Sequence, residues 1–196
     1  MRVIPVGDRA ALVEVGDAVA AASLAAWARA AGVEAAEIVP AATTVLFNGI
    51  DPEVVVGVVD RWPPDAVMRD GPLVRVAVAY DGPDLETVAA HWGCSVDEVV
   101  SRHTGIEFVS TFTGFAPGFA YLAGLPADWA VPRLATPRAR VAPGSVGLAD
   151  TWCGVYPTAS PGGWQLLGRT VAVDVPEDRD PPALLAPGTR VRFEAT

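Results

Sequence analysis

The sequence predicts an α+β fold with two domains, a small α/β domain over residues 1–71 and a β-barrel or sandwich domain over residues 72–196. Strand and helix patterns alternate in the first part of the chain. After Gly105 they give way to short apolar runs punctuated by Gly and Pro, which is typical of a barrel or a sandwich. The turn-forming residues Asp70–Gly71–Pro72 lie between the two patterns and mark the domain boundary.

Two helices are predicted in the first domain from their end residues. Asp17 is a typical helix N-cap, and Gly32 is a typical residue just after a helix, so the two delimit a helix. Asp51 followed by Pro52 has the pattern of a second helix start, and Pro63–Pro64 stops that helix after Trp62. The strands predicted around these helices are Val3–Pro5, Ala10–Val15, Val33–Val39 and Thr43–Phe47.

The second domain is predicted to consist mainly of strands. Leu73–Tyr80 is an apolar strand, and a helix begins at Asp84. Ser95-x-x-Glu98 is a capping box that opens the next helix, which ends near Thr104–Gly105. The strands predicted after these helices are Phe108–Phe112, Val146–Ala149, Gly154–Tyr156, Trp164–Leu167, Val171–Val175 and Arg190–Phe193.

The charge of the chain excludes several classes of function. The net charge is −9 and the pI is near 4.6. A field of this sign repels phosphate backbones, so nucleic acid is not an expected partner. All 14 basic residues are arginines, which excludes a phosphate-loop lysine, a Schiff-base lysine and a biotinylated lysine on this chain.

Cysteine usage and hydropathy indicate the compartment. Two cysteines, Cys94 and Cys153, and two histidines are too few for a zinc site or a disulfide framework, so no metal site is expected. The N-terminus lacks a basic segment followed by an apolar stretch, and no run of about 18 apolar residues exists. We therefore expect a cytoplasmic protein without a membrane span.

Aromatic residues concentrate in the second domain. Nine of the 15 aromatic side chains fall between Phe108 and Trp164, and Gly114–Pro143 has little periodicity. Large rings beside flexible backbone are typical of a ligand pocket, but a barrel core that needs tight turns has the same composition. A long segment without periodicity is either a functional loop or an element that the pattern misses.

Arg133, Arg138 and Arg140 form a basic island, because no acidic residue lies between Asp128 and Asp150. Such an island binds a carboxylate or a phosphate through paired hydrogen bonds. Alternatively, it forms a solvated loop or a surface that makes salt bridges with a partner. The sequence does not decide between these interpretations.

Further candidates for chemistry are His103, Ser145, Ser160 and Arg169. His103 ends a predicted helix, where a neutral imidazole serves as acid or base near pH 7 or is simply held by the helix C-terminus. Ser145 and Ser160 lie at turns where backbone N–H groups can converge on an anion. Arg169 follows Gly168 and can join the basic island in space.

A series of motifs gives a more specific indication. The segment Phe112–Leu125 reads FTGFAPGFAYLAGL and matches the signature F-x-G-F-x-P-G-F-x-Y-L-x-G-L. Several spaced motifs in one order are more specific than a single motif. The others are Arg102-His103-Thr104, Pro132-Arg133, Pro137-Arg138, Pro143–Gly147, Gly154–Pro157, Ser160–Trp164, Gly168–Thr170, and Pro181-Pro182 leading to Val191–Phe193. In these residues the chain resembles the KipI-type, or allophanate hydrolase subunit 1, proteins over nearly its whole length.

The resemblance implies a cyclophilin-like β-barrel for the second domain. Many bacterial members of the family are described as the B-type subunit of an ATP-dependent 5-oxoprolinase, which converts 5-oxo-L-proline to L-glutamate. The resemblance therefore implies a non-autonomous enzyme subunit in a hetero-oligomer. Its implied partners are a homologous C-type subunit and an A-type subunit, and its implied cosubstrate is ATP, with Mg²⁺ in the assembled complex.

The implied reaction activates the lactam oxygen with ATP, so cations and N–H donors are expected around the developing charge. His103 and Arg138 are the expected catalytic residues, His103 by moving a proton and Arg138 by contacting an anion. The other expected substrate- or anion-binding residues are Arg133, Ser145, Tyr156, Gly162, Gly163, Trp164 and Arg169. No metal ligand is expected.

Two alternative functions stay open at this point. One is a KipI-like inhibitor of a sensor histidine kinase, in which the aromatic and arginine residues would form a protein-docking face. The other is a carboxyltransferase-type subunit that processes allophanate or urea. Prolyl isomerase activity would rest on fold analogy alone, and a fold does not carry a function.

Overall fold

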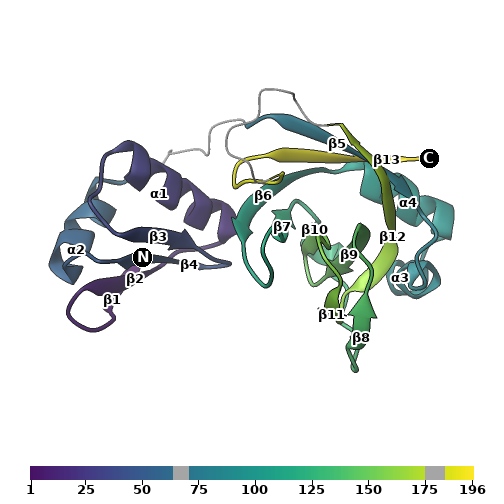
Figure 1. Ribbon diagram of the computed structural model, residues 1–196, viewed down its shortest axis with the longest axis horizontal. Helices are drawn as coiled ribbons and strands as arrows, with labels where there is room; N and C mark the ends of the chain where they lie inside the picture. Colours follow the sequence, from purple (N-terminus) through teal and green to yellow (C-terminus); the bar gives the residue numbers. More distant parts are fainter. Residues whose placement is uncertain (64–70, 175–183) are drawn as a thin grey trace. The chain divides into compact units, whose positions relative to one another are not determined.

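The computed structural model describes residues 1–63, 71–174 and 184–196. The backbone divides into two compact units, Met1–Asp70 and Gly71–Thr196 (Figure 1). Four residues or pairs that the sequence analysis uses lie outside the described residues: Pro64, Asp70, Val175 and Pro181-Pro182.

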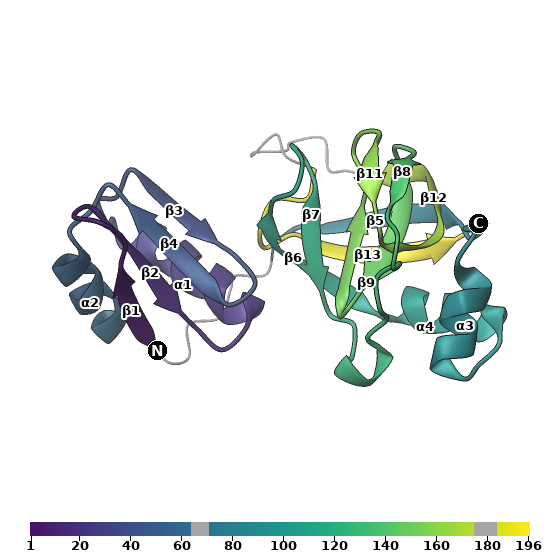
Figure 2. The same cartoon turned by 90° about the horizontal axis from the view of Figure 1, so that it is seen from below.

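The N-terminal unit contains β1 (Arg2–Pro5), β2 (Ala10–Glu14), α1 (Ala18–Ala30), β3 (Glu37–Pro40), β4 (Thr44–Asn48) and α2 (Pro52–Arg61). The strands form an antiparallel sheet in the order β1-β2-β4-β3. α1 packs on β3 and β4, α2 packs on β1 and β2, and together they bury one apolar core (Figure 2). Asp17 caps α1 as predicted, since its Oδ1 accepts the Ala20 N–H at 2.8 Å. The predicted strand Val33–Val39 begins only at Glu37, because the Val33 N–H donates to the Ala28 carbonyl (3.0 Å) and completes the end of α1.

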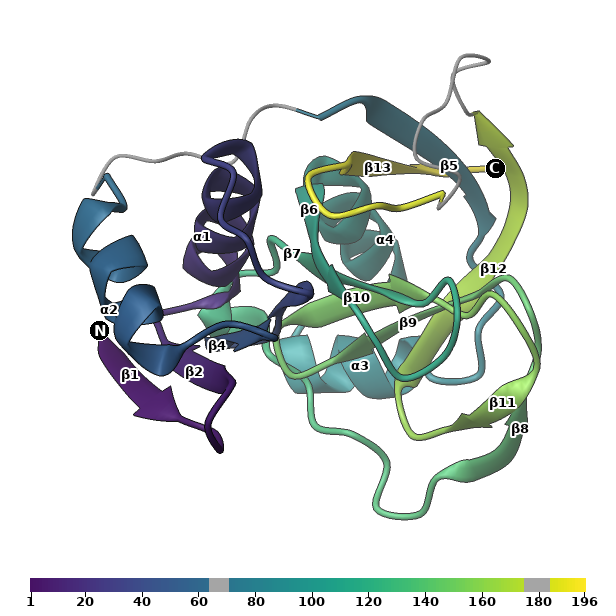
Figure 3. The same ribbon diagram turned by 60° about the vertical axis from the view of Figure 1, so that its left-hand side comes forward.

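The C-terminal unit is a closed barrel with two helices. Its elements are β5 (Leu73–Ala79), α3 (Leu85–Trp92), α4 (Val96–Gly105), β6 (Glu107–Thr113), β7 (Ala120–Ala123), the 3₁₀ helix η1 (Ala127–Trp129), β8 (Arg138–Val141), β9 (Ser145–Ala149), β10 (Trp152–Val155), β11 (Ser160–Gly162), β12 (Gln165–Asp174) and β13 (Arg190–Ala195). Seven of the described strands form the closed barrel, in the order β10-β7-β6-β13-β5-β12-β9. Figures 1 and 3 show β8 and β11 as a separate two-stranded sheet on the side of this unit opposite β13. The predicted α+β class is confirmed, and the second domain is a barrel rather than a sandwich.

Two details differ from the sequence expectations. The predicted strands Trp164–Leu167 and Val171–Val175 belong to one long strand, β12, which shifts register against both of its neighbours and so follows the curved barrel wall. The segment Gly114–Pro143, which lacks periodicity, contains β7, η1 and β8. In the described residues, no helix has the length and apolarity needed to cross a membrane.

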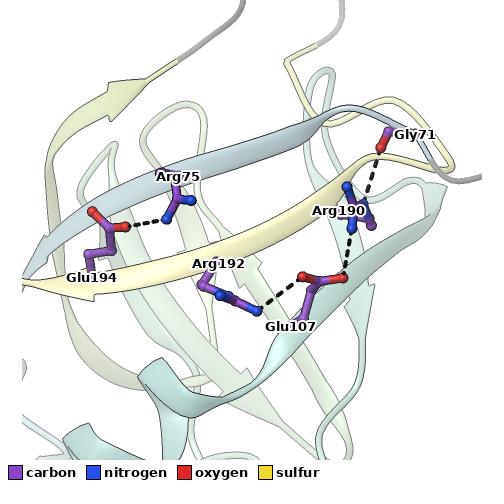
Figure 4. Close-up of polar contacts among 6 residues, drawn as sticks. All are labelled: Gly71, Arg75, Glu107, Arg190, Arg192 and Glu194. Carbon is purple, nitrogen blue, oxygen red and sulfur yellow. Dashed lines mark hydrogen bonds and ion pairs between the residues drawn. The ribbon is translucent and has the colours of Figure 1, made fainter.

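Ion pairs on the outer face hold β13 between β5 and β6 (Figure 4). Arg75 Nη1 lies 2.8 Å from Glu194 Oε1. Glu107 accepts Arg190 Nη1 at 3.3 Å and Arg192 Nη2 at 3.2 Å. These side chains are about one-third to one-half exposed, so each pair contributes less than about 1 kcal/mol to stability. Their main effect is to favour one register of β13 between its parallel and antiparallel neighbours.

Candidate functional site

An aromatic cluster lies outside the barrel core beside β7. Side chains alternate across a strand, so Leu122 joins the barrel core and Tyr121 points to the opposite side. There the Phe119 ring meets Tyr121, Tyr156 and Trp164 edge-to-face, with centroid distances of 5.3, 5.3 and 5.2 Å. This packing fixes the orientation of each ring.

The cluster forms the wall of a pocket of about 260 Å³. The lining residues are Phe115, Phe119, Tyr121, Arg133, Pro137, Tyr156, Pro161, Gly162 and Trp164. Arg133 is the charged side chain of this wall, and among the described residues it has no acidic partner. Its positive charge is therefore available to a ligand. Such a pocket fits a small, mainly apolar molecule with one negative charge.

Two hydrogen bonds between extended segments place Arg133 at the pocket. The Leu134 N–H donates to the Gly163 carbonyl (2.7 Å), and Gln165 Nε2 donates to the Pro132 carbonyl (2.9 Å). Arg133, between these two ties, lies so close to Gly163 that a Cβ atom on the glycine would be 3.6 Å from Arg133 Nη2. The backbone that carries the guanidinium is thus restrained on both sides.

A largely buried ion pair between Arg138 and Asp84 stabilises the same wall. Arg138 Nη2 donates to both carboxylate oxygens of Asp84, and Arg138 Nη1 donates to the Trp164 carbonyl at 3.3 Å. Asp84 Oδ2 also accepts the Leu166 N–H at 2.6 Å. Asp84 precedes α3 as predicted, but its side chain makes these contacts instead of capping the helix. The pair holds the backbone on both sides of Gln165 and thereby the position of Trp164.

The Tyr156 hydroxyl lies where these parts meet. A side chain at Gly162 would collide with its oxygen. Burial raises the pKa of Tyr156, and the guanidinium groups of Arg133 and Arg138 offset this effect only in part. The phenol therefore keeps its proton at neutral pH and is available as a hydrogen-bond donor.

Phe115 forms the rim of the pocket in an unusual conformation. Its φ is +68°, in the left-handed region that large side chains rarely adopt, and 60% of its surface is exposed. Its ring lies edge-to-face against Phe119 and Tyr156 at 5.3 and 6.3 Å. A strained backbone that holds a large apolar ring at a pocket entrance is typical of a functional site.

Comparison with known proteins identifies the family. The family described as the carboxyltransferase domain, subdomain C and D, matches residues 1–185. The chain belongs to the carboxyltransferase subdomain C and D family. This finding confirms the resemblance that the sequence motifs indicate.

Two relatives of this carboxyltransferase subdomain C and D chain are named as the B-type subunit of 5-oxoprolinase. The protein from Escherichia coli O157:H7 is 46% identical over 138 residues, which cover 68% of this chain and 63% of that protein. The protein from Bacillus subtilis (strain 168) is 44% identical over 124 residues, which cover 62% and 52%. The chain thus matches between about half and two-thirds of these relatives' own length. The urea amidolyase of Kluyveromyces lactis shares the fold, with a TM-score of 0.77 and 18% identity over 99% of this chain and 15% of that one.

The pocket of this family member brings together several residues expected from the sequence. Arg138 does not line the pocket, because its guanidinium is paired with Asp84. Gly163 adjoins Arg133. The expected binding residues that line the pocket are Arg133, Tyr156, Gly162 and Trp164.

Ser145 and Arg169 lie elsewhere in the barrel unit. Ser145 is buried in β9, and its N–H donates to the Ala142 carbonyl at 3.3 Å, so this group is not free for an anion. Arg169 is exposed on β12 and pairs with Asp81 at 2.9 Å. Neither residue lines the pocket, so the structure does not bring them into the candidate site.

His103 lies inside the barrel core, outside the pocket lining. Its Nδ1 is 2.7 Å from Tyr80 Oη and its Nε2 is 3.4 Å from Cys153 Sγ, while Phe108 and Phe193 pack on the ring. Complete burial lowers the pKa of His103 to about 3 and raises the pKa of the Cys153 thiol. The imidazole is therefore neutral and joins α4 to the barrel.

Some residues of the site are not found by pattern analysis of the sequence. The rings of Phe115, Phe119 and Tyr121 belong to the Phe112–Leu125 motif. The density of aromatic residues in that motif is the signal that could have indicated them. Asp84 has the appearance of an ordinary helix N-cap, and no local pattern connects it to Arg138. The additional residues are Phe115, Phe119, Tyr121, Pro137, Pro161 and Asp84.

The donor set of the pocket suits a carboxylate better than ATP. Within residues 1–63, 71–174 and 184–196 there is no group of three or more His, Cys, Asp or Glu side chains placed to hold a metal ion, and Cys94 and Cys153 are free thiols. The pocket wall offers one guanidinium and hydrogen-bonding phenols. A magnesium triphosphate needs carboxylate oxygens for the metal and several donors for the phosphates. This pocket therefore does not fit ATP, and we assign no ATP-dependent step to it.

Proposed function

We propose that this chain is a subunit of a 5-oxoprolinase and that its aromatic pocket holds 5-oxo-L-proline. The observation that carries this proposal is that apolar ring walls and Arg133, which has no acidic partner within the described residues, line the same pocket. The substrate is a small five-membered ring with one carboxylate. A ring of this size suits a small apolar pocket, and its negative charge complements Arg133. The names of the relatives at 46% and 44% identity support the same activity.

In this proposal the chain binds and orients the substrate. Arg133 neutralises the carboxylate, and the rings of Phe119 and Trp164 enclose the lactam and exclude water from its faces. Hydrolysis adds water to the carbonyl carbon, breaks the C–N bond and yields L-glutamate. We propose that ATP is used at sites supplied by the partners, a homologous C-type subunit and an A-type subunit, in a cytoplasmic hetero-oligomer.

The test is ATP-dependent glutamate formation from 5-oxo-L-proline by the purified A-type and C-type subunits, with and without this chain. We expect turnover only when the chain is present. Arg133→Gln should lower kcat/KM at least about tenfold, because the carboxylate loses a charge-assisted contact. Arg140→Gln is the matched control, since Arg140 is exposed on β8 and does not line the pocket.

Three outcomes would contradict the proposal in different ways. Full activity of Arg133→Gln would show that the substrate does not bind in this pocket. Complex formation without turnover would favour another amide or a urea-like substrate. Neither complex formation nor turnover would favour a regulatory docking protein.

A further inference from the structure

The Tyr156 hydroxyl is a donor that has no acceptor among the residues the structure describes. Tyr156 is 1% exposed and lines the pocket. No hydrogen bond from its O–H to another described residue is found. The Tyr156 hydroxyl is not one of the fully buried polar atoms that lack a partner among the described residues, so it has access to the pocket it lines, and a ligand that supplies an acceptor there gains a hydrogen bond on binding.

The hydroxyl packs directly against Gly162. Gly162 lines the pocket next to Tyr156, and any side chain there would collide with the phenol oxygen. The next residue along the chain, Gly163, lies beside Arg133, since a Cβ atom on it would be 3.6 Å from Arg133 Nη2. One wall of the pocket therefore presents a fixed cation and a neutral O–H donor near each other.

This pair of groups matches the functional edge of a five-membered lactam acid. Such a molecule carries a carboxylate and a ring carbonyl on the two carbon atoms that flank the ring nitrogen. A guanidinium suits the carboxylate, and a phenol O–H suits the neutral carbonyl oxygen. A saturated carbocyclic acid of the same ring size offers the carboxylate alone.

We infer that Tyr156 is the specificity-determining residue of the pocket, because its O–H donates to the ring carbonyl of the ligand whose carboxylate Arg133 holds. This inference rests on the proposed function and adds to it the group that distinguishes a lactam from other small cyclic acids. It gives Tyr156 a polar role in addition to its place in the apolar wall.

Calorimetric titration of the full chain, alone and with the C-type subunit, tests the inference with two ligands. The ligands are 5-oxo-L-proline and cyclopentanecarboxylate, which shares the ring size and the carboxylate but lacks the carbonyl. We expect the wild-type chain to bind 5-oxo-L-proline about fivefold more tightly, the value of one neutral hydrogen bond. Tyr156→Phe should lose this preference and keep its affinity for cyclopentanecarboxylate.

Two further variants separate the contributions. Arg133→Gln should weaken both ligands to a similar extent, because both carry the carboxylate. Tyr80→Phe removes a phenol oxygen outside the pocket, at the His103 contact, and should keep the wild-type preference. Thermal unfolding of each variant checks that the fold is retained. If Tyr156→Phe does not fold, equal affinity of the wild-type chain for the two ligands would still overturn the inference.

The outcomes distinguish this inference from the proposed function. If neither ligand binds to the wild-type chain in either state, the substrate assignment fails and the inference fails with it. If both ligands bind with equal affinity, the inference is overturned while the anion site stands. If Tyr156→Phe weakens both ligands equally, Tyr156 is a wall residue and the inference is likewise overturned.

Discussion

Arg138 and Asp84 join two elements through a single nitrogen atom, since Arg138 Nη2 lies 2.7 and 2.9 Å from the two carboxylate oxygens of Asp84. The two residues are 54 positions apart, at the beginning of β8 and immediately before α3. Their side chains are 27% and 8% exposed, so solvent screens the pair only weakly. This contact makes the wall behind the pocket depend on an element distant in sequence.

Asp84→Asn should lower the free energy of unfolding by about 2 kcal/mol, because it leaves the Arg138 guanidinium without its counter-charge in a poorly solvated position. Urea denaturation at neutral pH measures this change. Asp81→Asn is the control, since the Asp81–Arg169 pair is exposed and should contribute less than about 0.5 kcal/mol. Equal losses in the two variants would show that the Asp84 pair has no special structural role.

Gly162→Ala and Gly163→Ala should have opposite consequences although the positions are adjacent. A Cβ atom at Gly162 would collide with the Tyr156 hydroxyl, whereas one at Gly163 would meet Arg133 and Pro137 at an ordinary 3.6 Å. We expect Gly162→Ala to weaken binding of 5-oxo-L-proline at least about tenfold by displacing the phenol. Gly163→Ala should bind within about twofold of the wild type. Calorimetry compares them, and similar affinities would contradict the prediction.

Phe115→Gly should be more stable than Phe115→Ala by about 1 kcal/mol, because Gly adopts a φ of +68° without the strain that any Cβ atom causes. Both variants remove the same exposed ring, so the comparison isolates the backbone. Thermal unfolding of the two proteins measures the difference. A more stable alanine variant would mean that the left-handed conformation is not maintained in solution.

Protonation of His103 should destabilise the protein in acid. The unfolded-state pKa is near 6.5 and the folded-state pKa is about 3, so between these values the unfolded state binds the extra proton. The free energy of unfolding should therefore fall as the pH decreases, by about 2 kcal/mol from this group between pH 7.5 and 5. Denaturation of the wild type and His103→Gln at both pH values measures this contribution, because carboxylate titrations are common to both proteins. Parallel pH profiles would show that His103 titrates normally in the folded state.

Local patterns predict much of the secondary structure and part of the site. Asp17 caps α1, and Ser95 and Glu98 form the complete capping box at the start of α4, as their spacing predicts. The density of rings and the presence of Arg133 among the lining residues of the pocket agree with the ligand-pocket interpretation of the second domain. These features depend on residues a few positions apart, or on composition, and both are visible in a single sequence.

Contacts between distant residues could not be predicted in this way. His103 has the appearance of an accessible acid or base at a helix end, yet the packing of α4 buries it against Tyr80 and Cys153. Arg169 has the appearance of a member of the basic island, but β12 places it on the surface beside Asp81. In both cases the surroundings of the side chain are set by pairing partners from other parts of the chain.

The sequence by itself determined most helix ends, most strands and the family, because hydrogen bonds at helix ends and apolar periodicity act over a few residues. Only the tertiary structure decided that β13 runs parallel to β5 and that Tyr121 and Leu122 face opposite sides of the barrel wall. It also decided that Arg138 is paired while Arg133 is available to a ligand. Charges and rings on neighbouring motifs acquire different surroundings only when packing brings distant segments together, and burial and charge pairing then determine what each group can do.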